Sequence, residues 1–485
     1  MNVKQYMVSA VVVSALTFTQ GTLLYAGNTT EATPPPANSI STVESAQTTN
    51  RLIMRFNKAH ISLPVKEVLA QLSNRISIQM TYVRTMGTGD IVFKLPSFQN
   101  TQQIQQLVDQ LQQQPEVEYV EPDWMMQPKV PMSITPTDPL FNQQWSLLSD
   151  QYFGSINVQQ AWQQNQGQGV VVAVLDSGYL PHQDLKENLL SGYDMVSDPV
   201  MANDGDGRDN NPLDPGDAHL AGECSQFGTQ PIAQDTLSSW HGTQIAGVIA
   251  AAANNIGISG IAHQAKILPV RTVGKCGGYT SDLVDGIRWA AGLTVANVPL
   301  NEHPAQIITI SSSEPGKCKA SLQQAIDKAN QKGITIIVAA GNNGDQANHY
   351  SPGNCQNVIA VTASDFDGKL TDYSNRGEGV TVAAPGGVKE PLHAGILSTS
   401  NTGYRNAASD SYQYAAGTGL AAAHVAGVAA ILYSLQPTIT PIEIKQLITS
   451  TAQKQPKCSE CGHGVIDAGA AVNKAMKYKY RFFSY

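Results

Sequence analysis

The sequence predicts an α/β domain built on a parallel sheet, preceded by a small α+β domain. From Val170 to Thr362, short Val- and Ile-rich runs alternate with helical stretches, a pattern typical of parallel strands covered by helices on both faces. One helical stretch, Ala415–Leu435, is apolar or small on every side, so it must pass through the middle of the core. Between Asn50 and Trp124, strand and helix patterns follow in a β-α-β-β-α-β order, which predicts a ferredoxin-like unit.

Length and composition fit a globular chain. The 485 residues are 42% hydrophobic and 14% charged, and the formal net charge is −8. Such a length suggests about two to four domains. The acidic balance argues against a nucleic-acid partner, which would require a basic face. Beyond the N-terminus we find no apolar run of the roughly 18–20 residues that a membrane span needs, so we expect no membrane contact once the N-terminal segment is removed.

Residues 1–26 have the features of an export signal. Lys4 precedes an apolar stretch, and Ala26 lies at the expected cleavage point; a membrane anchor is the alternative. Residues 27–49 are rich in Thr, Pro and Ser and predict a flexible linker. We therefore expect the protein outside the cytoplasm, secreted to the medium or, as a second alternative, kept in the periplasm.

The six cysteines of an exported chain are expected to form three disulfides. Cys458 and Cys461 are close enough in the sequence to form a local loop. The alternative is a zinc site that includes His463, but no fourth ligand is nearby.

The first domain is expected at residues 50–124. Asn100 is the predicted cap of its second helix, whose apolar residues share one face. Strands are predicted at Arg51–Phe56, Ile76–Val83, Ile91–Leu95 and Val117–Val120, and helices at Leu63–Leu72 and Thr101–Gln114.

A proline-rich connector, residues 125–137, leads to the second domain at residues 138–477, and a basic, aromatic tail follows at 478–485. Strands of the second domain are predicted at Val170–Leu175, Ala265–Val270, Ile307–Ile310, Ile334–Ala339 and Val358–Thr362. Helices are predicted at His241–Ala253, at Ser281–Val295 with Ser281 as its cap, and at Ser321–Gln331.

Three short motifs place polar residues next to these elements. A buried strand ends at Asp176, a helix of small residues opens at His241, and another strand leads into Gly341 and Asn342. Side chains at the carboxyl ends of parallel strands point into the crevice where ligands bind. Each motif alone is weak, since any of them occurs by chance in many proteins.

The segment Gly417–Gly427, GTGLAAAHVAG, resembles the central helix of subtilisin-like serine proteases, whose pattern reads GTSMAAPHVAG. With the three motifs in the family's order, the match covers about 250 residues. The resemblance implies a subtilisin-like three-layer fold and acyl transfer by an Asp-His-Ser triad. His241 would be the general base and then the general acid, Asp176 would orient it, and Asn342 would donate to the oxyanion.

The family's nucleophilic serine falls on Gly419, which has no side chain. In a subtilisin, loss of this serine lowers kcat by about 2 × 10⁶. Two substitutes are conceivable: Thr418, whose side chain projects in another direction, and a water activated by His241, which would react slowly. We therefore predict a peptide-binding pseudoprotease that is inactive or severely impaired. The alternative is an active secreted serine endopeptidase in which Gly419 is a sequence or engineering change.

Two further departures lie around the same cleft. Where the family has a Ser-Leu-Gly segment that pairs with the substrate backbone, this chain has Ser311, Ser312 and Ser313, followed by Glu314. Gln244 stands where the family commonly has a second histidine. Several changes around one cleft favour a relaxed constraint on the residues that line it. The expected ligands of the cleft are protein or peptide chains.

The resemblance extends to the first domain, whose ending Val117–Asp123 (VEYVEPD) is similar to that of the subtilase prodomain. It implies a folding chaperone that also inhibits its own peptidase domain; an unrelated α+β domain is the alternative. The family cuts itself in the connector, so without a nucleophile residues 125–137 are expected to stay uncut. The resemblance also implies two disulfides, Cys224 with Cys276 and Cys318 with Cys355.

Calcium is the structural ion that the family resemblance suggests. A turn-rich loop carries five carboxylates in 14 residues, and hard carboxylate oxygens at alternating positions suit Ca²⁺; a solvated acidic loop is the alternative. The expected ligands are Asp204, Asp206, Asp209, Asp214 and Asp217.

Overall fold

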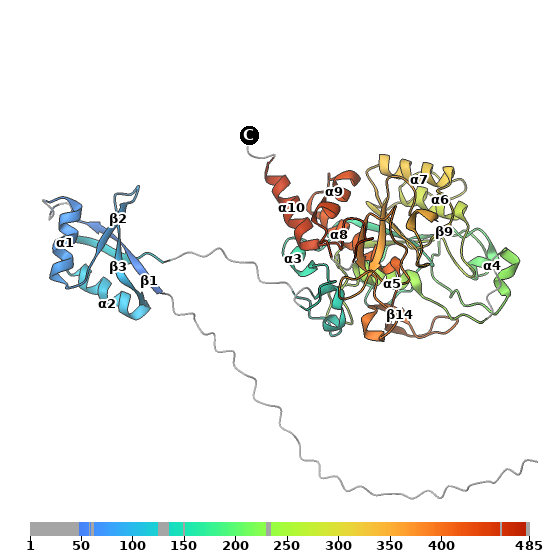
Figure 1. Ribbon diagram of the computed structural model, residues 1–485, viewed down its shortest axis with the longest axis horizontal. Coiled ribbons are helices and arrows are strands. Elements are labelled where there is room, and N and C mark those ends of the chain that lie inside the picture. Colours follow the sequence, from blue (N-terminus) through green and yellow to red (C-terminus); the bar gives the residue numbers. More distant parts are fainter. Residues whose placement is uncertain are drawn as a thin grey trace, which may run out of the picture. The chain divides into compact units, whose positions relative to one another are not determined.

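The computed structural model describes residues 48–57, 59, 63–124, 135–148, 151–228, 234–455 and 458–481. The chain divides into two compact units, residues 1–129 and 130–485, and each is described separately (Figure 1). The expected export signal lies outside the described residues, as do nearly all of the linker and most of the connector.

The first unit is a four-stranded antiparallel sheet with two helices. The strand order is β2-β3-β1-β4, and every neighbouring pair is antiparallel, as expected for a ferredoxin-like unit. Leu72 of one helix and Leu111 of the other are fully buried in one core with the strands. Its elements are β1 (Thr48–Phe56), α1 (Val65–Arg75), β2 (Thr81–Thr85), β3 (Ile91–Asn100), α2 (Thr101–Gln112) and β4 (Val117–Pro122).

Local hydrogen bonds and backbone angles account for the boundaries of these elements. Asn100 caps α2, because its side chain accepts from the Gln103 N–H while the Gln103 side chain accepts from the Asn100 N–H. The predicted strand Ile76–Val83 is wrong in its first half, since Ser77 has φ 56° and turns the chain before β2 starts. β1 begins at Thr48, two residues inside the expected linker.

The second unit is built on a seven-stranded sheet in the order β13-β12-β10-β8-β5-β7-β6, with all neighbours parallel. The strands are β5 (Val171–Asp176), β6 (Tyr193–Asp194), β7 (Lys266–Arg271), β8 (Ile307–Ile310), β10 (Thr335–Ala339), β12 (Ile359–Ser364) and β13 (Val382–Pro385). Two smaller antiparallel pairs join β9 (Glu314–Pro315) to β11 (Tyr350–Ser351), and β14 (Ile396–Asn401) to β15 (Asp410–Ala415).

Helices cover both faces of this sheet, which makes three layers (Figure 1). Val172 and Val174 of β5 belong to the core shared with α5 and α8. Ala173 and Leu175 belong to the core shared with α6 and α7. The helices are α3 (Val158–Trp162), α4 (Pro199–Ala202), α5 (His241–Ala250), α6 (Thr280–Ala290), α7 (Ala320–Gln331), α8 (Thr418–Leu435), α9 (Pro441–Thr451) and α10 (Ala468–Arg481).

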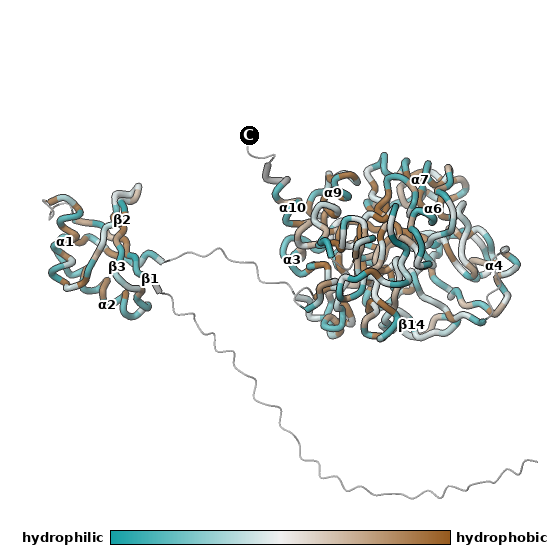
Figure 2. The backbone as a smooth tube through the Cα atoms, in the orientation of Figure 1, coloured by the Kyte–Doolittle hydropathy of each residue, from teal (hydrophilic) through white to brown (hydrophobic). Residues whose placement is uncertain are grey.

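The helix α8 runs through the core as its composition predicts. Figure 2 shows apolar residues concentrated on the central strands and the helices packed on them. By length and hydropathy α8 could cross a membrane, contrary to the expectation that no such run exists, but 89% of it is buried inside the protein. Ala415 is not part of it, because it ends β15.

Two other expectations about helix ends are corrected. Ser281 does not cap α6, which begins one residue earlier with Tyr279 as its cap residue and no side-chain hydrogen bond there. The helix α10 continues to Arg481, four residues into the expected tail.

The six cysteines form three disulfides in the second unit. Cys224 pairs with Cys276 and Cys318 with Cys355, the pairs that the family resemblance implies. Cys458 pairs with Cys461, so neither sulfur is a thiolate and the alternative zinc site with His463 is wrong.

Candidate active site

Asp176 and His241 meet at the carboxyl edge of the sheet. Asp176 is the last residue of β5, and His241 is the first residue of α5. His241 Nδ1 lies 2.8 Å from Asp176 Oδ1 and 3.0 Å from Asp176 Oδ2. Asp176 is buried and is also held by the Ser177 N–H at 2.7 Å. A proton on Nδ1 is therefore favoured, which leaves Nε2 of a 38% exposed ring for the cleft.

Gly419 lies opposite that nitrogen. A Cβ built on Gly419 would be 3.2 Å from His241 Nε2 and 3.1 Å from both His241 Cε1 and the Ser311 Cβ. The structure thus brings the position of the family's nucleophile to the predicted base, with no hydroxyl on it. Gly419 is the second residue of α8, so its N–H lies in the first turn, where backbone donors lack helical acceptors.

Asn342 and Thr418 are joined by hydrogen bonds at the start of α8. Asn342 Oδ1 accepts from both the N–H and the hydroxyl of Thr418, each at 2.9 Å. The amide is thereby oriented, and its Nδ2 is left to donate. Thr418 is buried, and its hydroxyl also accepts from the Gly341 N–H at 3.2 Å. That hydroxyl is engaged by Asn342 and Gly341, which makes it a poor substitute nucleophile.

The negative charge of Asp176 and the positive charge of protonated His241 stabilise each other. Burial by itself would raise the pKa of Asp176, but the charge and hydrogen bond of His241, with the Ser177 N–H, hold it below its usual value. Loss of hydration would lower the pKa of His241, yet the charge and hydrogen bond of Asp176 raise it, with smaller contributions from Asp217 and Asp214. A protonated imidazole is therefore stabilised in this cleft.

Asp214 and Asp217 belong to this cleft, which their sequence pattern did not indicate. The Ser177 hydroxyl donates to Asp214 Oδ2 at 2.7 Å and accepts from the Gly242 N–H at 3.1 Å, which links Asp214 to the start of α5. Burial raises the pKa of Asp214 to about 6. Asp217 accepts from the N–H and the hydroxyl of Ser239, two residues before His241. These roles can be identified only from contacts in the folded structure and not from the sequence.

The five aspartates expected as calcium ligands do not form one site. Asp204 Oδ2 accepts from Arg271 at 2.9 Å, and Asp214 and Asp217 hydrogen-bond to cleft residues. Where the structure describes the chain, no three of these carboxylates bring an oxygen each within 4.8 Å of one another. Members of the set thus serve separate hydrogen-bond networks, and calcium binding by these residues stays a prediction.

Another cluster of metal-ligand atoms is unsuitable as a metal site. His219, Cys224 and Cys276 place their ligand atoms within 4.8 Å of one another, but the two sulfurs are joined in a disulfide. They line a pocket of about 500 Å³ that extends to Asp176 and His241. We read this cluster as the far wall of the cleft.

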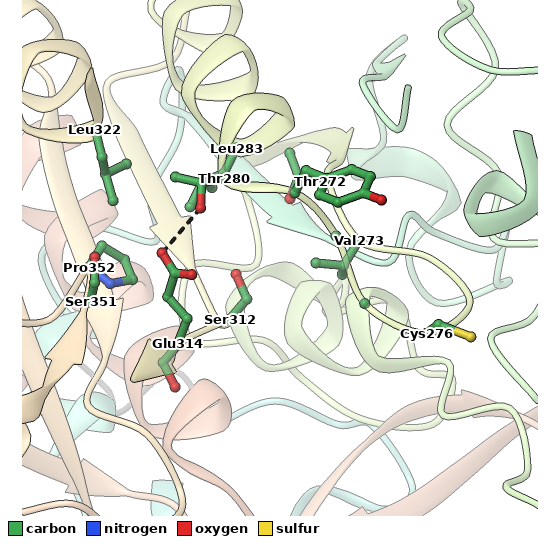
Figure 3. A pocket seen from close by; sticks show the side chains of 14 residues that line it. Thr272, Val273, Cys276, Thr280, Leu283, Ser312, Glu314, Leu322, Ser351 and Pro352 are labelled. Carbon is green, nitrogen blue, oxygen red and sulfur yellow. Dashed lines mark hydrogen bonds between the residues drawn. The ribbon is translucent and has the colours of Figure 1, made fainter. Parts of the chain in front are cut away.

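The expected substrate edge follows β8. Ser311 and Ser312 line the pocket beside His241, whereas Ser312 and Ser313 also line a neighbouring pocket of about 240 Å³ (Figure 3). In that view, the Glu314 carboxylate points toward the Thr280 hydroxyl, which donates to it at 3.1 Å. Lys319 Nζ lies 2.7 Å from the same carboxylate. The departures from the family pattern are thus accommodated without closing either pocket.

Other histidines of the second unit serve its structure. His424 is fully buried in α8, with Nδ1 2.8 Å from the Leu420 carbonyl oxygen, and burial lowers its pKa to about 4. His182 Nε2 lies 3.1 Å from the Ser411 carbonyl oxygen. Gln244, at the family's second histidine position, is buried in α5 and donates to the Ser239 carbonyl.

Comparison with known proteins agrees with this fold and this geometry. Residues 167–467 match the Subtilase family, which groups peptidases of the S8 class. The extracellular basic protease of Dichelobacter nodosus is 39% identical over 420 residues, which cover 84% of this chain and 67% of that protein. The extracellular protease of Xanthomonas campestris is 40% identical over 404 residues, covering 82% of this chain and 67% of that protein.

A solved structure of a protease from Pseudoalteromonas arctica superposes with a TM-score of 0.68 at 46% sequence identity, and the match covers 70% of this chain and 99% of that chain. The chain thus combines a parallel-sheet α/β domain, an Asp–His pair at the carboxyl edge of the sheet, and relatives that are named extracellular proteases. The chain belongs to the subtilase family of serine endopeptidases, and the expected fold class is confirmed.

Proposed function

We propose that this chain is an exported subtilase that binds protein or peptide chains in its cleft but hydrolyses them at a negligible or severely reduced rate. The observation that carries the proposal is Gly419. Its backbone lies at the predicted base His241, where a Cβ would be 3.2 Å from Nε2, but Gly419 itself carries no hydroxyl that could attack. The nearby Thr418 hydroxyl is buried and bonded to Asn342.

The rest of the machinery supports peptide binding. Asp176 and His241 form their pair, and Asn342 is oriented to donate an amide proton. Without the serine, oxyanion donors and binding still leave a residual acceleration of about 10³–10⁴ over water in a subtilisin. The intact pair also favours a second candidate, an active serine endopeptidase in which Gly419 is a sequence or engineering change.

The first unit is proposed to be a prodomain that acts as an intramolecular inhibitor. Its ferredoxin-like order and the ending Val117–Asp123 support this assignment. The predicted export signal at residues 1–26 and the relatives named as extracellular proteases support export. Calcium binding by Asp204, Asp206, Asp209, Asp214 and Asp217 stays a prediction.

Restoring the serine is the direct test. We expect Gly419→Ser to raise casein hydrolysis by at least about a thousandfold over the unaltered chain, because it returns the group whose loss costs a subtilisin about 2 × 10⁶ in kcat. A Cβ at this position is tight by a few tenths of an ångström, and the 38% exposed His241 ring has room to adjust. Gly419→Ala is the matched control, since it adds the same Cβ without the hydroxyl.

Two outcomes each contradict one of the candidates. Hydrolysis by the unaltered chain at a rate close to that of Gly419→Ser contradicts the loss of activity. If Gly419→Ser folds but stays inactive, the active-endopeptidase alternative is excluded and the altered edge at Ser313 and Glu314 also blocks catalysis.

A further inference from the structure

We propose that the smaller pocket, of about 240 Å³ beside Glu314, binds one basic side chain, arginine or lysine, of a peptide that lies in the cleft. This inference rests on the proposed peptide-binding function and names the peptides that the cleft prefers. It follows from the size of the pocket, from its apolar walls and from the carboxylate that it contains.

The pocket adjoins the larger one beside His241 and has room for a single side chain. Val273 and Ser312 line both pockets. A peptide that passes His241 along the edge after β8 therefore comes within reach of the smaller pocket. Its volume of about 240 Å³ is below the roughly 300–1,000 Å³ of pockets that take drug-sized ligands, so it suits one side chain rather than a larger group.

Apolar side chains form much of the wall of this pocket. Leu283 of α6 and Leu322 of α7 line it, together with Val273 and Pro352. The methylene groups of an arginine or lysine side chain cover such surface well, while the charged end stays in polar surroundings. A short acidic or amide side chain leaves more of this wall in contact with water, which favours a long aliphatic stem.

Glu314 supplies the charge that a basic side chain needs. It begins β9, and its side chain reaches toward Thr280 at the start of α6 (Figure 3). Its Oε1 accepts from the Thr280 hydroxyl at 3.1 Å and lies 2.7 Å from Lys319 Nζ. Among the described residues, its Oε2 has no hydrogen-bond partner, and the side chain is 41% exposed. Because a carboxylate has about four lone-pair sites, Oε2 can accept from an incoming cation.

Lys319 limits the size of the preference. Its ammonium group already pairs with Glu314, so an incoming cation meets a like charge as well as the carboxylate. Both side chains are partly exposed, at 52% for Lys319 and 41% for Glu314, and water screens such pairs. Exposed ion pairs change affinity by at most about fivefold. With the repulsion included, we expect about a threefold preference for a basic side chain.

The test compares arginine with citrulline, its neutral isostere, on the full chain. Fluorescently labelled hexapeptides with an alanine background carry one or the other at each position in turn, and their dissociation constants are measured by anisotropy at low salt. Competition from the linked N-terminal unit lowers all affinities by the same factor. General attraction of the acidic chain for arginine raises the ratio at every position alike, so the contrast between positions is the readout.

We expect the arginine peptide to gain about threefold over citrulline at one position relative to the others. The gain should shrink as salt is added, because salt screens partly exposed charges. A lysine at the same position should bind more tightly than norleucine for the same reason.

Three variants make the assignment specific. Glu314→Gln keeps an acceptor for Thr280 but removes the charge, so the ratio at that position should fall to the level of the others. Lys319→Gln removes the competing cation and should raise the gain to about fivefold. Glu302→Gln, the same exchange at an exposed position ahead of β8, should leave the gain unchanged.

Equal ratios at all positions overturn this inference and leave the peptide-binding function standing. A gain that persists in Glu314→Gln also overturns it, since another group then binds the cation. If Glu314→Gln does not fold, an unchanged gain in Lys319→Gln has the same meaning. Failure of every peptide to bind at millimolar concentration overturns the proposed function as well.

Discussion

At Gly419, the absence of one hydroxymethyl group separates this chain from a complete acyl-transfer site. The pair of Asp176 and His241 and the oriented amide of Asn342 are in place around it. Retention of these groups is compatible with binding, because the same donors that stabilise an oxyanion also bind a carboxylate. At the scale of single residues, the retained groups are those that the proposed peptide binding uses.

A buried acid gives a second consequence at this scale. Asp184 is fully buried, accepts from the Ile258 N–H at 2.9 Å, and has its pKa raised to about 7 by burial. Since the folded state favours the neutral acid, the stability that Asp184 contributes is complete below about pH 4 and is lost as the pH rises through about 7. The loss by pH 8 is on the order of a few kcal/mol.

We expect Asp184→Asn to lose less stability than the unaltered chain between pH 5 and 8, because the other buried acids with raised pKa values, such as Asp214, still titrate over that range. Urea unfolding at pH 5, 6.5 and 8 measures this. Asp367→Asn, at an exposed aspartate, should follow the unaltered chain. Parallel pH profiles for Asp184→Asn and the unaltered chain would falsify the assignment.

At the scale of elements, α8 is the piece on which the site depends. The small residues of α8 let neighbouring backbone approach closely. Its first turn carries Gly419. Its middle packs against the segment around Ile261. A Cβ built on Gly427 would lie 2.6 Å from the Ile261 Cβ and 2.7 Å from its Cγ2. Gly427 is thus required by packing rather than by backbone conformation.

Gly427→Ala should therefore destabilise the second unit by about 1–3 kcal/mol through overpacking, although alanine gains about 1 kcal/mol in helix propensity. Thermal and urea unfolding of the full chain measure the change. Gly353→Ala is the control, because a Cβ there meets its neighbours at 3.5 Å or more and should change stability by less than about 0.5 kcal/mol. A Gly427→Ala protein as stable as this control contradicts the packing argument.

At the scale of the whole molecule, two separately folded units are joined through the segment that the family cuts. The first unit ends its last strand at Pro122, and the second begins its described structure at Thr135. If the second unit lacks a nucleophile, it cannot release the first, and the proposed inhibitor stays covalently attached at high effective concentration.

The intact mass of the protein from the medium of a protease-deficient host tests this. We expect residues 27–485 for the unaltered chain, and a product that starts near residues 135–138 for Gly419→Ser. Measuring the rate at several protein concentrations shows whether the Gly419→Ser cut is made in cis. A concentration-independent cut in the unaltered chain contradicts the proposed loss of hydrolysis.

Much of the fold follows from local pattern. The strand β8 is predicted with its observed bounds at Ile307–Ile310, because three isoleucines and a threonine, all β-branched, favour a strand. The failures lie at element boundaries. Ser77 adopts a left-handed φ and α6 starts after Tyr279 without a side-chain cap, and the periodicity of apolar residues indicates neither.

The sequence by itself determined the sheet-and-helix plan, the buried helix α8 and the missing nucleophile at Gly419. These properties depend on the periodicity of apolar residues and on the chemical identity of single side chains. Only the tertiary structure decided that the charges of Asp214 and Asp217 act on His241, and that Thr418 is engaged by Asn342. The physical reason is that hydrogen bonds and charge interactions act over a few ångströms, between residues that are 24 to 76 positions apart in the chain.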